Sequence, residues 1–155
     1  MIGNIDDALK NLLLRDIPFL EENKVYFETP DREFKPSLPA INLFLYDVSE
    51  NLDLRDNETR SLRGNGTATN WRPPVRVDCS YLITAWAGAI RDEHTLLGEV
   101  MRALLRYTTL PVEILPPPLR EQEAPLPTTV LQPSYLQSVG EFWQALDGKP
   151  KAALN

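Results

Sequence analysis

The sequence predicts an α+β domain built on a single mixed β-sheet that two or three helices flank. Three observations lead to this prediction: a strictly alternating stretch at Val75–Trp86, an apolar run at Ile41–Val48, and an amphipathic stretch of helical period that begins at Asp92. Strands and amphipathic helices in one chain bury their apolar sides by packing the helices on a sheet. The length of 155 residues is that of one ordinary domain.

The composition is that of a globular protein and argues against several function classes. Sixteen basic against 22 acidic residues give a net charge of −6, whereas broad nucleic-acid binding needs a dense basic surface. One Cys excludes an internal disulfide, and one Cys with one His cannot complete a usual four-ligand zinc site. No apolar run approaches the roughly 20 residues that cross a bilayer. Asp6 and Asp7 stand where a signal peptide carries basic residues, so we expect a cytoplasmically made, reduced domain without a cleaved leader.

The first third of the chain predicts one helix and two strands. Apolar residues at helical spacing indicate a helix at Ile5–Arg15, which Pro18 ends. The short aromatic and β-branched segment Lys24–Glu28 predicts a strand. Ile41–Val48 is apolar on both faces, which is typical of an interior strand that is covered on two sides.

Val75–Trp86 predicts a long strand, which we expect to be central. One face carries apolar or small residues throughout, whereas the other begins with Arg76 and Asp78 and becomes apolar later. We therefore expect the first half of this second face to meet solvent or a partner. Cys79 falls on the apolar face, where the ordinary interpretation is a small buried hydrophobic side chain.

The second half of the chain predicts two helices and two short strands. From Asp92 onward the apolar stripe consists of Leu96, Leu97, Val100, Met101, Leu104 and Leu105. Val112–Leu115 and Thr128–Leu131 are short apolar runs that we expect to be strands. A last helix is expected to begin at Ser134 or Ser138, to place Phe142 and Trp143 in the core and to end at Gly148 and Pro150.

Prolines punctuate the chain and concentrate in the segment 111–133. Fourteen prolines are about 9% of the residues, against an average near 5%. Because proline lacks a backbone donor and resists both helix interiors and central strands, this segment predicts extended connectors or arms.

The polar stretch Ser49–Arg72 predicts a long loop with an unusual content of arginine and tryptophan. A structureless loop of this length is uncommon in a compact domain and is usually functional or disordered. Arg and Trp are favoured anchors at protein interfaces because both offer large planar contact areas. A solvated loop with incidental charge is the alternative that the composition leaves open. The candidate subunit-interface residues are Arg55, Arg60, Arg63, Trp71, Arg72 and Arg76.

The sequence contains few residues of the types that usually carry out catalysis, so we predict no catalytic, cofactor-binding or metal-ligating residues. His94 is the single imidazole, and a general base would need a hydroxyl or thiol partner and an orienting acid. Gly64–Gly66 lies in a polar stretch, not between a strand and a helix, and so does not predict a phosphate loop. Two alternatives remain open: a small carboxylate-dependent hydrolase or transferase that uses Asp47 and Asp78 with His94, and a monomeric peptide-binding module.

Four linked segments resemble the N-terminal domain of cap proteins from contractile injection systems of the antifeeding-prophage and virulence-cassette type. These segments are INLFLYDV, RPPVRVDCSYLITAWAG, DEHTLLGEVMRALLRY and FWQALDGKP. They occur in the family's order from the first helix to Pro150, and the most specific part is Arg72–Tyr107.

The resemblance implies a fold similar to that of phage tail terminators and a structural, non-enzymatic role. Such caps close the upper end of the inner tube as a ring, usually a hexamer, and contact the sheath. The implied partners are further copies of the chain, the inner tube protein and the sheath protein, without nucleic acid, cofactor or direct membrane insertion. The particle would assemble in the cytoplasm and be released or attached through other subunits. Residues 1–150 would form the domain, and 151–155 would begin a further strand or a truncated C-terminal extension.

Overall fold

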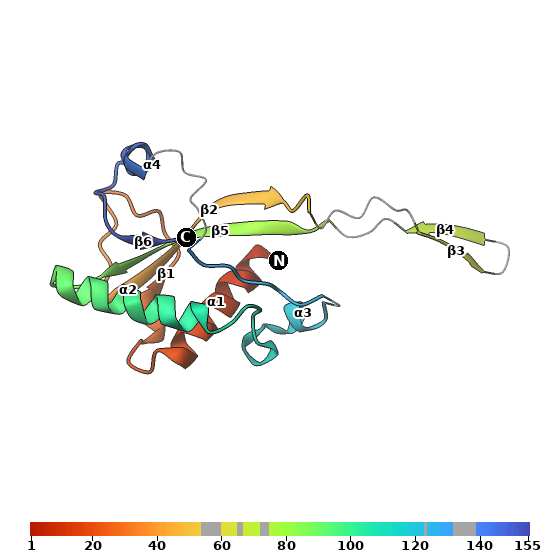
Figure 1. Cartoon of the computed structure of the whole chain (residues 1–155), viewed down its shortest axis with the longest axis horizontal. Coiled ribbons are helices and arrows are strands. Elements are labelled where there is room, and N and C mark those ends of the chain that lie inside the picture. Colours follow the sequence, from red (N-terminus) through yellow and green to blue (C-terminus); the bar gives the residue numbers. More distant parts are fainter. Residues whose placement is uncertain (54–59, 65–66, 72–74, 123, 132–138) are drawn as a thin grey trace. The chain divides into compact units, whose positions relative to one another are not determined.

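The structure is a computed structural model of the whole chain, and it describes residues 1–53, 60–64, 67–71, 75–122, 124–131 and 139–155 (Figure 1). For 60–64 and 67–71 the description covers the backbone. The chain divides into two compact units. The core unit comprises Met1–Phe44 and Tyr81–Asn155, and the hairpin unit comprises Leu45–Ser80.

A four-stranded mixed sheet organises the core unit, as the sequence predicts. Its strands are β1 (Val25–Tyr26), β2 (Ala40–Glu50), β5 (Val77–Trp86) and β6 (Ala153–Leu154), in the spatial order β1-β2-β5-β6 (Figure 1). β1 runs parallel to β2 with Val25 opposite Ile41, and β6 runs antiparallel to β5 with Leu154 opposite Ile83. The two long strands therefore occupy the interior of the sheet, which confirms the central position expected of β5.

Helices cover this sheet and close the core. They are α1 (Ile2–Asp16), α2 (Ile90–Leu105), α3 (Pro117–Arg120) and α4 (Val139–Ala145), with 3₁₀ turns at Glu22–Lys24 and Val112–Ile114. α1 and α2 pack on each other. The fully buried side chains include Leu12 and Leu13 of α1, Val100 of α2 and Trp143 of α4, which is 1% exposed. The expectation that Trp143 belongs to the core is confirmed.

Both long strands change environment along their length. Ala40–Leu43 of β2 is buried at every position, as two-sided coverage requires, whereas Asp47–Glu50 is exposed. In β5, Tyr81–Ala85 is buried, whereas Val77 and Asp78 are exposed. The expectation that the first half of the second face meets solvent is confirmed by the exposed Asp78, and Val77 shows that the other face also begins exposed.

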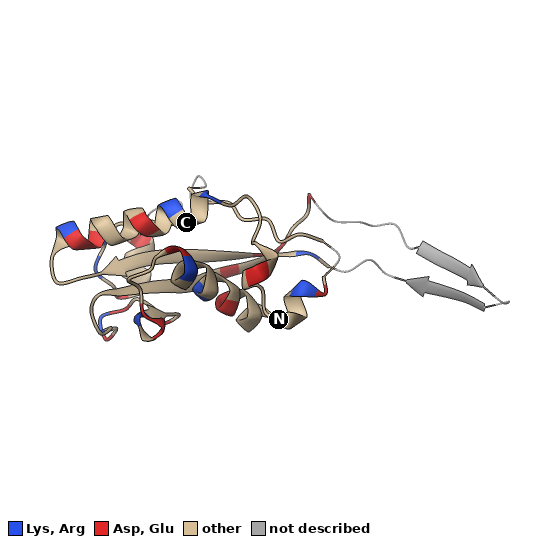
Figure 2. Ribbon diagram, turned by 90° about the horizontal axis from the view of Figure 1, so that it is seen from below, with Lys and Arg blue, Asp and Glu red and all other residues tan. Residues whose placement is uncertain are grey.

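Both long helices begin earlier than the sequence indicates. α1 starts at Ile2 instead of Ile5, with Met1 as its N-cap. Asp6 therefore lies inside this helix, and its carboxylate accepts a hydrogen bond of 2.6 Å from the Tyr81 hydroxyl. α2 starts at Ile90, which places Asp92 in the first turn, where its charge suits the helix dipole. Figure 2 shows that acidic and basic residues both occur along the helices.

Three predicted strands are shortened or replaced. Lys24–Glu28 contributes only the two-residue β1. Val112–Leu115 forms a 3₁₀ turn, flanked by Pro111 and Pro116, which restrict the backbone and cannot donate to a ladder. Thr128–Leu131 is not a strand, since the structure places only an isolated bridge between Thr109 and Pro127 in this region.

The last helix ends in a Schellman motif centred one residue before the expected glycine. Asp147 has a positive φ of 53°, its N–H donates to the Gln144 carbonyl, and the Gly148 N–H donates to the Trp143 carbonyl at 3.0 Å. Gly148 is required for another reason. A Cβ there would lie 2.6 Å from the Pro30 carbonyl oxygen, so no larger residue fits without moving the backbone. The expected start at Ser134 or Ser138 lies outside the described residues.

The hairpin unit contains a β-hairpin where the sequence predicts a loop. β3 (Arg60–Gly64) and β4 (Thr67–Trp71) pair antiparallel, with Arg60 opposite Trp71 and Gly64 opposite Thr67. The prediction of a structureless Ser49–Arg72 is therefore wrong. Two signals were present: Asn65-Gly66 is the dipeptide preferred in two-residue hairpin connections, and β4 is rich in threonine and tryptophan.

A buried asparagine fixes the segment that follows β1 against β2. The side chain of Asn42 is 0% exposed; its Oδ1 accepts from the Glu28 N–H at 3.0 Å and its Nδ2 donates to the Glu28 carbonyl at 2.8 Å. The amide thus substitutes for a backbone partner that the two-residue β1 does not supply.

We expect Asn42→Ala to destabilise the protein by about 2–4 kcal/mol, because it leaves the N–H and the carbonyl of Glu28 without their partner. Urea denaturation monitored by circular dichroism measures this free energy. Asn51→Ala is the matched control, since the side-chain hydrogen bonds of Asn51 to Asp78 are exposed, and it should cost less than about 1 kcal/mol. Equal losses in both variants would contradict this role of Asn42.

Candidate functional site

The described part of the hairpin unit exposes apolar side chains that a folded monomer ordinarily covers. Four large apolar residues are uncovered, with exposed fractions of 44% for Val48, 68% for Leu52, 70% for Val75 and 37% for Val77. Exposed apolar groups that cluster in this way mark interaction surfaces more often than isolated ones do.

Two of these apolar side chains, Val48 and Val77, share a face of the strand pair. The Asn51 N–H donates to the Arg76 carbonyl at 2.9 Å, and the Asn51 side chain donates to both carboxylate oxygens of Asp78 at 3.1 Å. Asn51 and Asp78 therefore lie on the same face, and because side chains alternate along a strand, Val48 and Val77 lie on the opposite one. By the same alternation Glu50 shares the face of Val48, so this face combines exposed apolar side chains with a carboxylate.

The predicted interface residues fall in or beside this unit. Arg76 is exposed and directly precedes β5. Arg60, Arg63 and Trp71 belong to β3 and β4 by their backbone, and their side chains lie outside the description. Arg55 and Arg72 lie outside the described residues. The use of these six residues in subunit contacts stays a prediction.

Of the residues considered for catalysis, Asp47 and Asp78 belong to the hairpin unit and His94 to the core unit. Asp78 bonds to Asn51, and Asp47 is an exposed strand residue of the hairpin unit. His94 is exposed on α2 in the core unit. Cys79 is half-buried and not fully buried as expected. Over the described ranges, no three His, Cys, Asp or Glu side chains gather in a way that could hold a metal ion.

A groove of about 420 Å³ lies in the core unit between the first two turns of α2 and the segment 149–152. The apolar part of its lining includes Trp86, Ile90 and Leu97, and His94 and Lys149 also line it. The sequence analysis did not identify this groove, because its walls come from segments more than fifty residues apart in the chain.

Lys151 lines this groove and fixes the entry into β6. Its ammonium group donates to the Ala85 carbonyl and to the Glu93 carboxylate, both at 2.8 Å, and stands 3.8 Å from the centre of the Trp86 ring. The side chains of Lys151 and Glu93 are 15% and 21% exposed. A largely covered ammonium with an opposite charge and an aromatic face holds this segment on the sheet.

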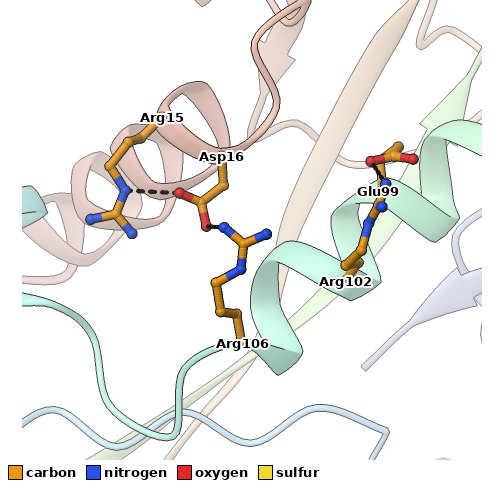
Figure 3. A network of polar contacts seen from close by, with 5 residues as sticks. All are labelled: Arg15, Asp16, Glu99, Arg102 and Arg106. Carbon is orange, nitrogen blue, oxygen red and sulfur yellow. Dashed lines mark hydrogen bonds and ion pairs between the residues drawn. The ribbon is translucent and has the colours of Figure 1, made fainter.

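A second polar cluster joins the ends of α1 and α2 (Figure 3). The Asp16 carboxylate, 5% exposed, accepts from Arg15 Nε at 2.8 Å and from Arg106 Nη1 at 3.2 Å. Burial raises the pKa of the Asp16 carboxyl, but the hydrogen bonds from Arg15 and Tyr107 and the charges of both arginines outweigh it, so the pKa lies below the ordinary 3.8. On α2 itself, Arg102 pairs with Glu99 one turn earlier (Figure 3).

The whole domain, including the groove and the strand pair, corresponds to a known protein family. The model of the Pvc16 N-terminal domain matches residues 4–155. The chain belongs to the Pvc16 N-terminal domain family. The resemblance that the sequence segments indicate is thereby confirmed.

Two solved structures are similar to the chain over 99% of its length. One is the sheath/tube terminator of an extracellular contractile injection system, PVC, in the extended state, at 26% identity and a TM-score of 0.74. The other is the tube-terminating cap of the anti-feeding prophage, at 26% identity and a TM-score of 0.65. The chain spans about half of each, 53% and 52%. No curated protein matches it.

The chain thus shares its fold with tube terminators of contractile injection systems, as expected. Within the described residues, none of the helices combines the length and the apolar character needed to cross a membrane.

We expect Asp16→Asn to lower stability at neutral pH by about 1–3 kcal/mol, because it weakens charge-assisted hydrogen bonds to two arginines. Since the pKa of Asp16 is lowered in the folded state, its contribution is present above about pH 4 and is lost as the pH falls through the folded pKa. Urea denaturation at pH 7 and pH 3 tests both statements. The exposed Asp7→Asn is the control. A difference between wild type and Asp16→Asn that does not shrink at pH 3 would contradict this account.

Proposed function

We propose that this chain is a structural, non-enzymatic part of the cap of a contractile injection system, which terminates the inner tube. The observation that carries the proposal is the match to a sheath/tube terminator over 99% of the chain at 26% identity. The family match over residues 4–155 supports it independently of the structure.

The cap acts as a homo-oligomeric ring, which we expect to be a hexamer, seated on the upper end of the tube and in contact with the sheath. Two features of the hairpin unit support contacts between copies: the exposed side chains of Val48 and Val77, and the two arginines of β3, Arg60 and Arg63. Arginine facing acidic surfaces of tube or sheath would set the register of the stack. Assembly takes place in the cytoplasm, as part of a phage-tail-like particle.

The direct test combines light scattering and negative-stain imaging of the protein with and without its tube protein. We expect rings seated on tube ends and tubes of limited length, because a terminator stops growth at the end that it covers. Without tube protein the chain can remain monomeric, since a tube end presents several copies side by side. A protein that leaves tube length unchanged and is absent from the tube ends would contradict the proposal.

Charge reversal in the hairpin tests its part in assembly. We expect Arg60→Glu with Arg63→Glu to reduce binding to tube ends at least tenfold while the melting temperature of the monomer stays within a few degrees, because each reversal turns an interfacial attraction into a repulsion. Co-sedimentation with tubes measures the binding. The control is Arg32→Glu with Lys35→Glu, which makes the same charge change at exposed positions of the core unit. Equal binding of both variants would exclude this role of the hairpin arginines.

A further inference from the structure

The groove beside α2 and the segment 50–53 of the hairpin unit have complementary surfaces. The groove is lined by apolar side chains and a lysine, and the segment carries Leu52 between two carboxylates. We propose that the groove binds Leu52 and Asp53 from the hairpin unit of a second copy, so that each copy inserts into the next one. This inference rests on the proposed ring, and it names the contact that links neighbouring copies.

The groove offers an apolar floor with a positive rim. Ile90 is 71% exposed at its edge, and Leu97 lies two turns further along the same side of α2. Lys149 is exposed and forms no ion pair among the residues that the structure describes. Lys151 already has Glu93 as its partner, so Lys149 is the ammonium that remains for an incoming carboxylate. The volume of about 420 Å³ is in the range of pockets that enclose small ligands.

The hairpin unit offers a matching apolar and acidic segment. Leu52 is 68% exposed and lies in a bend just beyond β2, outside the paired strand. Glu50 and Asp53 flank it, and both are exposed. Among the exposed large apolar residues that the structure describes, only Leu52 and Val48 have a carboxylate within two positions on each side. Leu52 is the better candidate for insertion because its side chain is more exposed than that of Val48 and because it lies outside the paired part of β2.

The contact joins two different surfaces and is therefore heterologous. A heterologous contact leaves one free insert and one free groove on every dimer, so association continues. It ends in a ring when the rotation between successive copies closes and in an open filament when it does not. A self-complementary contact would end at a two-fold dimer. The proposed insert and groove thus account for a ring on a tube end without any second type of contact.

Cysteine pairs test the contact in the full-length chain. In a Cys79→Ala background, which removes the only native thiol, Leu52→Cys and Ile90→Cys are combined in one chain and treated with a short bis-maleimide, with and without tube protein. We expect a ladder of cross-linked oligomers. The control combines Leu52→Cys with Leu105→Cys, which is 53% exposed at the far end of the same helix, and it should give at least fivefold less product.

Mixing the two single-cysteine chains distinguishes the heterologous contact from other arrangements. A mixture of Leu52→Cys and Ile90→Cys chains should give cross-linked dimers and nothing larger, and neither chain alone should give product. A cross-link within one chain would show that the groove binds its own hairpin unit and would overturn the proposal. Equal yields with Ile90→Cys and Leu105→Cys would also overturn it.

The proposed ion pair between Lys149 and Asp53 is tested by exchanging the two charges in the chain that carries Leu52→Cys and Ile90→Cys. Lys149→Glu should lower the yield about fivefold, and adding Asp53→Lys should restore it, as expected of a partly exposed pair. A yield that Lys149→Glu leaves unchanged would overturn the pairing of Lys149 with Asp53. Binding to tube ends without the predicted cross-link would overturn this contact alone, whereas failure to bind tube ends would overturn the proposed function.

Discussion

The two-sided burial of the inner halves of β2 and β5 is the constraint on which the rest of the structure depends. Ala40–Leu43 and Tyr81–Ala85 have apolar cover on both faces, so every polar group among them needs a partner inside the protein. Asn42 binds the backbone of Glu28, and the Thr84 hydroxyl accepts a hydrogen bond from the Trp86 indole at 2.9 Å. The Tyr81 hydroxyl bonds to Asp6 and so ties α1 to β5. These bonds fix how the helix and the edge segments dock on the sheet.

β2 and β5 both continue beyond their buried halves, and their exposed halves form the candidate contact surface of the domain. Val48 and Val77 keep the alternation of a buried strand but are exposed, so burial of their apolar surface is still available for association. Under the proposed function, part of this burial takes place only when a neighbouring copy or a tube end is present, which couples the affinity of the subunit to assembly.

The distribution of charge and of exposed apolar surface agrees with the proposed function. The two similar solved structures are terminators of injection-system tubes, and the described residues of this chain carry exposed apolar side chains and largely covered charge pairs. Asp16 and Lys151 illustrate the use of charge in this domain. Each side chain is largely buried and forms an ion pair with a residue from another segment, so these charges hold the elements of the core unit together. The exposed strand face and the groove are the surfaces that can bind partners.

The sequence by itself determined the class of the fold, the long strand β5, the helix α2 and the family, because periodicity and linked motifs are local signals. It also contained the Asn65-Gly66 signal for the hairpin, which the polar composition of Ser49–Arg72 outweighed in the prediction. Only the tertiary structure decided which parts of the alternating strands are covered, since alternation reports two faces but not what packs on them. It alone brought Lys151 to Glu93 and Trp86, because contacts across 58 residues leave no trace in local spacing.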